Sequence, residues 1–202
     1  MKWLNWPNRF TIARIVFVGP LVICLLNMGQ WEHARHVALG LFCAVSLTDA
    51  LDGYLARRLN EETPLGRFLD PVADKLLITS CVILLATGPA EAAGVAIPNW
   101  VPVIAIGKDL LITIGFGLVY LTTGQFFVRP RPLGKTCTLL QLFMIAVVLV
   151  SPDLPPRLRE AAPLFWWAAS GLAIAAAVDY LVVGNRFARR QHLADQEKSS
   201  PS

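Results

Sequence analysis

Long apolar runs, separated by short polar or basic segments, extend along most of the chain. A helix needs roughly 20 residues to cross the hydrocarbon core of a membrane, and the runs reach about that length. The pattern therefore predicts an all-α, polytopic membrane protein with six transmembrane helices. The expected helices cover residues 10–27, 36–57, 67–88, 99–123, 133–150 and 161–183.

The segments outside these helices are short. The helices and their connections fill residues 1–190, which we interpret as a single membrane domain without room for a separate soluble domain. Residues 1–8 contain Trp3 and Trp6 and are expected to form an interfacial segment, since tryptophan favours the membrane–water boundary. Residues 191–202 are polar, and we expect a disordered tail there.

Composition and charge also favour a membrane protein. Of the 202 residues, 55% are hydrophobic and 16% are charged, against about 45–50% and about 25% in soluble domains. The net charge of +4 favours anionic lipid over nucleic acid as the partner, because Lys and Arg collect at one set of helix ends. We expect these ends and both termini to be cytoplasmic. The basic residues are Lys2, Arg9, Arg57, Arg58, Arg67, Arg129, Arg131, Lys135, Arg186, Arg189 and Arg190.

A group of aspartates marks the stretch with the clearest chemistry. Asp49 and Asp52 are three residues apart at the end of the second predicted helix, and Asp70 and Asp74 are four apart at the start of the third. Spacings of three and four place each pair on one helical face. Because the connection between the two helices is short, we expect antiparallel neighbours whose carboxylates converge on the cytoplasmic side.

Carboxylates gathered near hydrocarbon need compensating positive charge. Each costs roughly 2.5–3.5 kcal/mol at mid-membrane on insertion scales, and mutual repulsion adds to that cost. Hard divalent ions such as Mg²⁺, Mn²⁺ or Ca²⁺ suit this donor set better than zinc, which favours His or Cys. Two such ions about 3.5–4 Å apart would form a clamp for phosphoryl transfer.

Two other interpretations of the acidic cluster stay open at this point. The aspartates could cap helix ends or pair with Arg57, Arg58 and Lys75. They could also line a proton or ion pathway, although such a pathway would spread acids across the membrane. A membrane transporter or a non-catalytic scaffold is the corresponding alternative function.

The residues around the cluster resemble a known family signature. The pattern D-x2-D-G-x2-A-R-x8-G-x3-D-x3-D is made by Asp49, Asp52, Gly53, Ala56, Arg57, Gly66, Asp70 and Asp74. It resembles the signature of the CDP-alcohol phosphatidyltransferases, and the six-helix layout is similar over most of the chain. The resemblance implies transfer of a phosphatidyl group from CDP-diacylglycerol to an alcohol, with release of CMP. It also implies a homodimer.

The resemblance implies roles for individual residues. The aspartates would bind two divalent cations, Mg²⁺ or Mn²⁺, and Asp74 would also act as general base toward the acceptor hydroxyl. A second set would contact the CDP moiety: Gly53, Ala56, Arg57 and Gly66, with Asn8 and Thr11 from the similar segment Asn8-x2-Thr11-x2-Arg14. Thr11 could instead cap the first helix.

The signature does not identify the acceptor alcohol. The surrounding stretch resembles phosphatidylglycerophosphate synthases and single-motif cardiolipin synthases. This resemblance favours glycerol 3-phosphate as acceptor and leaves phosphatidylglycerol as the alternative. Candidates for binding the acceptor are Lys108, Arg129, Arg131 and Lys135, which could equally be topology markers. Asp109 and Asp179 are further acids inside predicted helices, and the sequence assigns them no role.

Overall fold

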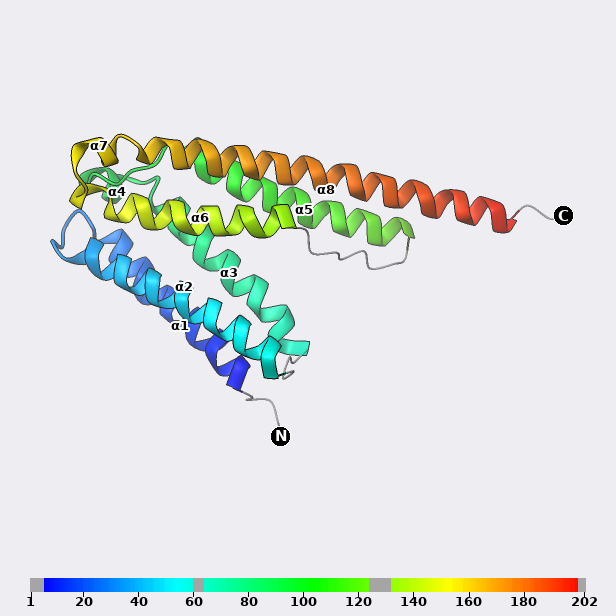
Figure 1. The fold of residues 1–202 in the computed structure, drawn as a ribbon, viewed down its shortest axis with the longest axis horizontal. Coiled ribbons are helices and arrows are strands. Elements are labelled where there is room, and N and C mark those ends of the chain that lie inside the picture. The colour runs from blue at the N-terminus through cyan, green and yellow to red at the C-terminus, as the bar shows by residue number, and fades with distance from the viewer. Residues whose placement is uncertain (1–5, 60–63, 124–131, 200–202) are drawn as a thin grey trace.

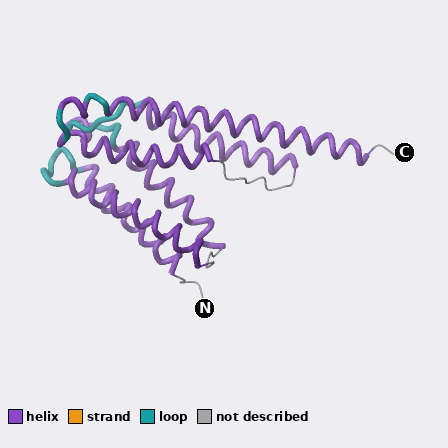
Figure 2. Tube along the Cα trace, viewed as in Figure 1, coloured by secondary structure: helices purple, strands orange, loops and turns teal. Residues whose placement is uncertain are grey.

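The computed structural model describes the backbone of residues 6–59, 64–123 and 132–199, and most side chains within 13–49, 72–121 and 132–186. Helices make up most of this part of the chain, and it contains no strand (Figure 1 and Figure 2). The predicted all-α fold is confirmed. The elements are α1 (Trp6–Leu26), α2 (Ala34–Leu59), α3 (Pro64–Leu84), α4 (Gly88–Ala92), α5 (Trp100–Thr123), α6 (Pro132–Val150), the short 3-10 helix η1 (Ser151–Asp153), α7 (Pro156–Arg159) and α8 (Ala162–Ser199).

Prolines mark where several helices begin. Pro64, Pro132 and Pro156 are the first residues of α3, α6 and α7, and Pro89 is the second residue of α4. Proline fits the first turn because its fixed φ suits a helix and the N–H that it lacks would have no partner there. Gly94 follows α4 with a φ of +71°, a conformation that glycine adopts without strain. Local sequence therefore sets these boundaries.

The helices form two groups that meet at one end of the molecule and diverge toward the other (Figure 1). In one group α1 packs along both α2 and α3, and in the other α8 packs along both α5 and α6. Contacts of α2 with α6, and of α3 with α5 and α6, join the groups. The short helices α4 and α7 lie where the groups meet, while the start of α1 and the end of α8 lie away from that end (Figure 1).

The buried core lies where the two groups meet. Its largest fully buried side chains include Leu21 of α1, Phe42 of α2, Leu85 directly after α3, and Met144 of α6. Phe42 lies in the half of α2 that is remote from the acidic signature, and Leu85 follows the end of α3 that is remote from it. Close packing therefore holds one end of the molecule, and the predicted site lies toward the other.

Among the residues whose side chains are described, two helical stretches are long and apolar enough to cross a membrane by length and composition, Pro132–Asp153 and Pro156–Arg186. In α1 the apolar stretch is shorter, Ala13–Leu26. Most of the signature lies in parts of α2 and α3 whose side chains are outside the described ones, so these helices are not tested for membrane-spanning length. The six-span topology is therefore not confirmed and stays a prediction.

The ends of the chain differ from the sequence-based expectations. α8 continues as a helix to Ser199, whereas a disordered tail is expected over 191–202. Residues 191–199 contain no Gly or Pro and several strong helix formers, so the helix can propagate through them. α1 begins at Trp6, so the last part of the expected interfacial segment is helical, and residues 1–5 lie outside the described residues.

An ion pair ties the start of α2 to the end of α6. Arg35 donates to both carboxylate oxygens of Asp153 at 2.7 Å and to the carbonyl oxygen of Leu149 at 2.8 Å. His36 Nε2 lies 3.3 Å from the same carboxylate. The hydrogen bonds from Arg35 hold the pKa of Asp153 below its usual value near 3.8.

Asp153→Asn is expected to lower the thermal midpoint of unfolding at neutral pH and to have no effect in acid. A depressed pKa means that the carboxylate stabilises the fold above the unfolded-state value near 3.8, and that this stabilisation is lost as pH falls through the folded-state value. Thermal unfolding in detergent, from about pH 7 down to about pH 3, measures the difference between wild type and variant. A difference that stays constant over this range would contradict the assignment.

Candidate active site

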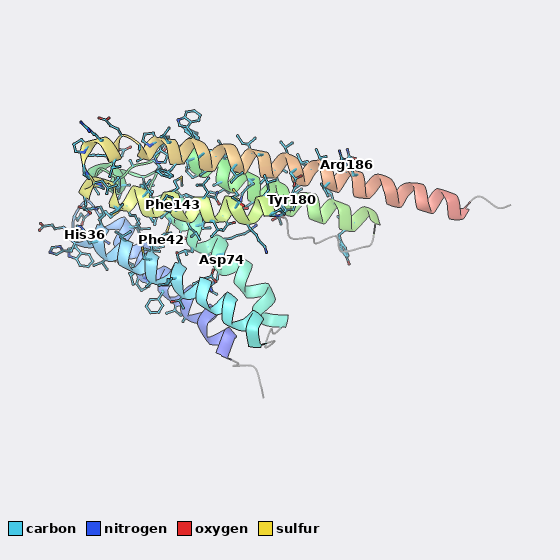
Figure 3. The ribbon with its side chains drawn as sticks, viewed as in Figure 1. His36, Phe42, Asp74, Phe143, Tyr180 and Arg186 are labelled. Carbon is cyan, nitrogen blue, oxygen red and sulfur yellow. The ribbon has the colours of Figure 1, made fainter. Side chains whose placement is uncertain are left out.

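Arg14 joins two of the predicted metal ligands. Its Nη1 lies 2.7 Å from Asp74 Oδ1, and its Nη2 forms an ion pair with Asp49 Oδ1. Arg14 belongs to α1, Asp49 to α2 and Asp74 to α3. One guanidinium therefore connects three helices at the point where Figure 3 shows Asp74 on α3.

The guanidinium is buried, while the carboxylates are partly exposed. The Arg14 side chain is 4% exposed, against 34% for Asp49 and 38% for Asp74. A buried cation requires anionic partners. The two carboxylates share one guanidinium, and their partial exposure leaves them accessible to a cation from the solvent side.

The structure brings Asp49 and Asp74 to one point. Asp52 and Asp70 lie on α2 and α3 about one helical turn closer to the connection between these helices, and their side chains lie outside the described ones. Within the described side chains, no group of three or more His, Cys, Asp or Glu residues could hold a metal ion. Convergence of all four carboxylates stays a prediction.

A third helix takes part in the meeting of the acids. The short connection predicts that α2 and α3 are direct neighbours, and the main contacts of both helices are to α1. Arg14 of α1 offers the physical reason, because its positive charge offsets the repulsion between Asp49 and Asp74. Lys75, an alternative partner of the cluster in the sequence analysis, pairs with Asp109.

The residues predicted to contact CDP lie on the same helices. Asn8 and Thr11 belong to α1, Gly53, Ala56 and Arg57 belong to α2, and Gly66 belongs to α3. Their side chains lie outside the described ones, so their contacts stay predictions. Because α1 begins at Trp6, Thr11 lies inside the helix, and its interpretation as a helix cap is wrong.

Lys108 is the acceptor candidate whose surroundings are described most fully. Its side chain on α5 is 7% exposed, and its Nζ lies 3.0 Å from Asp109 Oδ1. Lys75 of α3 approaches the same oxygen at 3.6 Å. Asp109, which had no assigned role, is therefore the counter-ion of two lysines on neighbouring helices.

The described contacts do not connect the other acceptor candidates to Lys108. Lys135 is exposed near the start of α6, and Arg129 and Arg131 lie outside the described residues. Beside Lys135, a Cβ added at Gly134 would lie 3.4 Å from the hydroxyl oxygen of Tyr180, which Figure 3 shows on α8. The glycine therefore allows α6 and α8 to approach closely.

Arg14 is the site residue to which the sequence analysis gave no role. It ends the segment Asn8-x2-Thr11-x2-Arg14 and is surrounded by Ile12, Ala13, Ile15 and Val16. An arginine inside such an apolar run indicates a buried acidic partner, which is the signal that could have found it. The partner itself could not be chosen from the sequence, because Asp74 lies 60 residues away along the chain.

Comparison with known proteins covers most of the chain. The model of a family described as CDP-alcohol phosphatidyltransferase matches residues 4–178, which include Arg14, Asp49 and Asp74. A CMP-forming cardiolipin synthase from Oryza sativa subsp. japonica is 34% identical over 190 residues, which cover 89% of this chain and 57% of the rice protein.

Two further relatives carry a different name. A CDP-diacylglycerol--glycerol-3-phosphate 3-phosphatidyltransferase from Bacillus subtilis is 34% identical over 156 residues, which cover 72% of this chain and 77% of that protein. A relative from Arabidopsis thaliana has the same name followed by the number 2. It is 31% identical over 187 residues, which cover 89% of this chain and 79% of that protein. The chain thus spans little more than half of the rice relative and a larger share of these two.

Lys108→Met is expected to lower the free energy of unfolding by about 1–3 kcal/mol, because it removes the buried cation nearest to Asp109. The matched change Lys75→Met removes a side chain that is 49% exposed and is expected to cost less than about 1 kcal/mol. Chemical denaturation in detergent measures both variants. Equal losses would show that the burial of Lys108 does not decide the stability of this group.

Proposed function

The chain belongs to the CDP-alcohol phosphatidyltransferase family, and from this premise we propose that it transfers a phosphatidyl group from CDP-diacylglycerol to an alcohol and releases CMP. The observation that carries the proposal is that Asp49 and Asp74, from two helices, converge on one buried positive charge. Both residues belong to the signature pattern. Side chains that act on one reacting group must meet in space, and these two do.

The donor set of the site suits divalent cations. Carboxylate oxygens are the preferred ligands of Mg²⁺ and Mn²⁺, and Asp49 and Asp74 already face a positive charge. We assign two such ions to Asp49, Asp52, Asp70 and Asp74. When bound, the ions neutralise charge on the diphosphate and on the leaving group.

The residues of the chain supply positioning and proton transfer. The acceptor hydroxyl attacks the β-phosphorus of CDP-diacylglycerol, a new P–O bond forms, and the bond to the phosphate oxygen of CMP breaks. Asp74 accepts the hydroxyl proton on a carboxylate oxygen. Its partial exposure lets an alcohol approach from the solvent side, where it must be held in line with the leaving group.

The nucleotide is assigned to the helix segments around the acids. Small residues leave one helix face open to a flat ligand, and an arginine can donate two parallel hydrogen bonds to a phosphate group. Gly53, Ala56 and Arg57 supply these features on α2. Gly66 of α3, with Asn8 and Thr11 of α1, completes the assignment.

Glycerol 3-phosphate is the acceptor that we propose. The names of the Bacillus and Arabidopsis relatives support it. The rice relative, named as a cardiolipin synthase, supports phosphatidylglycerol as the second candidate. Each acceptor carries a phosphate group, which we assign to Lys108, Arg129, Arg131 and Lys135.

We place the protein in a membrane with six crossings and with the site and both termini on the cytoplasmic side. The acyl chains of CDP-diacylglycerol then stay in the bilayer while its nucleotide reaches the site from water. The two apolar helical stretches and the distribution of basic residues support this placement. We further propose a homodimer. A transporter would favour broken helices at the acids, whereas α2 and α3 are continuous.

Asp74→Asn is expected to lower the rate of CMP release by about 10²–10⁴-fold, because an amide cannot take the proton of the acceptor hydroxyl. The rate is measured on purified protein with CDP-diacylglycerol, glycerol 3-phosphate and Mn²⁺, and EDTA should abolish it. Asp153→Asn, at the far end of the molecule, is the matched control and should keep the wild-type rate. An Asp74→Asn variant that turns over normally would refute the role of Asp74.

The acceptor is tested by supplying glycerol 3-phosphate or phosphatidylglycerol in turn at a fixed amount of CDP-diacylglycerol. Glycerol 3-phosphate is expected to support CMP release with phosphatidylglycerophosphate as the product, and phosphatidylglycerol is expected to support little. Chromatography of the lipid products identifies the reaction. Formation of cardiolipin at the higher rate would reverse the assignment.

A further inference from the structure

We propose that Arg14 competes with the divalent cations for the carboxylates of Asp49 and Asp74. Its guanidinium contacts both Asp49 and Asp74, and a cation that binds between these carboxylates displaces the guanidinium. The inference rests on the proposed function, since it takes both aspartates as metal ligands. Arg14 is a positioning residue, because it acts through the carboxylates that it orients.

Arg14 uses its two terminal nitrogens differently from Arg35, an arginine of the same chain with a structural role. Arg35 places Nη1 and Nη2 on the two oxygens of one carboxylate, that of Asp153. Arg14 places Nη2 on Asp49 and Nη1 on Asp74, so it bridges acids from two helices. Its guanidinium therefore occupies the position between the carboxylates that a shared cation needs.

A cation and the guanidinium cannot share this position. Mg²⁺ lies about 2.0–2.1 Å from its oxygen ligands, whereas Nη1 of Arg14 lies 2.7 Å from Asp74 Oδ1. An ion bound between Asp49 and Asp74 would draw the carboxylates closer together and would face a like charge. A divalent ion carries twice the charge of the guanidinium, so it attracts the two carboxylates more strongly.

The contact of Arg14 with Asp49 and Asp74 also orients the two carboxylates. Two carboxylates without a cation would repel each other, which would favour separation of α2 from α3 or uptake of a proton. Arg14, whose side chain is 4% exposed, keeps Asp49 and Asp74 facing each other before metal arrives. The same contact must lower the affinity for metal, because binding has to replace it.

Equilibrium binding of Mn²⁺ to the purified full chain, followed by electron paramagnetic resonance without substrate, tests the competition. Arg14→Gln is expected to bind Mn²⁺ about tenfold more tightly than wild type. The thermal midpoint of Arg14→Gln in EDTA should be lower than that of wild type. Adding Mn²⁺ should raise the midpoint of the variant by more than it raises that of wild type. Arg35→Gln is the matched control, in which the midpoint falls and the affinity for Mn²⁺ stays unchanged.

A second variant covers the case in which Arg14→Gln does not fold. Arg14→Lys keeps the positive charge but offers one ammonium in place of two guanidinium nitrogens, and it should bind Mn²⁺ more tightly than wild type by a smaller factor. Equal or weaker Mn²⁺ binding in the folded Arg14 variant overturns the inference.

Asp74→Asn distinguishes failure of this inference from failure of the proposed function. If this variant binds Mn²⁺ as well as wild type, the proposed metal site fails, and the inference fails with it. If Asp74→Asn weakens Mn²⁺ binding while neither Arg14 variant strengthens it, the inference alone fails. Weaker binding in Asp74→Asn together with tighter binding in the Arg14 variants supports both.

Discussion

A charged side chain buried among helices must find a partner of opposite charge, and this constraint organises the candidate site. Arg14 lies in an apolar part of α1, and its partners are Asp49 of α2 and Asp74 of α3. Leaving a guanidinium unpaired in such surroundings would cost far more than one ordinary contact contributes. The pairing therefore limits how α1, α2 and α3 can be placed relative to one another, and with them the acids of the signature.

The charged region around Arg14 is separate from the closely packed core of the molecule. Where the two helix groups meet, Phe42, Leu85 and Met144 are fully buried, and Arg35 binds one carboxylate with both ends of its guanidinium. Toward the other end the two helix groups diverge (Figure 1), and within one group Arg14 adds an ionic link between α1, α2 and α3 to their packing contacts. A site proposed to admit a lipid, a nucleotide and an alcohol is better placed where contacts can exchange than where side chains are close-packed.

A second charged group joins α3, which carries part of the acidic signature, to α5, which does not. Asp109 of α5 lies close to Lys108 of the same helix and to Lys75 of α3. Lys75 directly follows Asp74 along α3, so the two charged groups are one residue apart in sequence and lie on the same helix. This proximity gives the proposed acceptor lysine Lys108 a structural connection to the proposed general base, through α3.

The sequence by itself determined the helical fold class, the acidic signature and the family, because apolar runs, helical spacing and fixed residue patterns are local along the chain. Prolines begin α3 and α6 one to three residues before the predicted starts at 67 and 133. The tertiary structure decided that α1 packs against both acidic helices, that Arg14 bridges Asp49 and Asp74, and that Asp109 serves two lysines. An ion pair depends on which helices lie together, and Arg14 and Asp74, 60 residues apart, carry no local signal that pairs them.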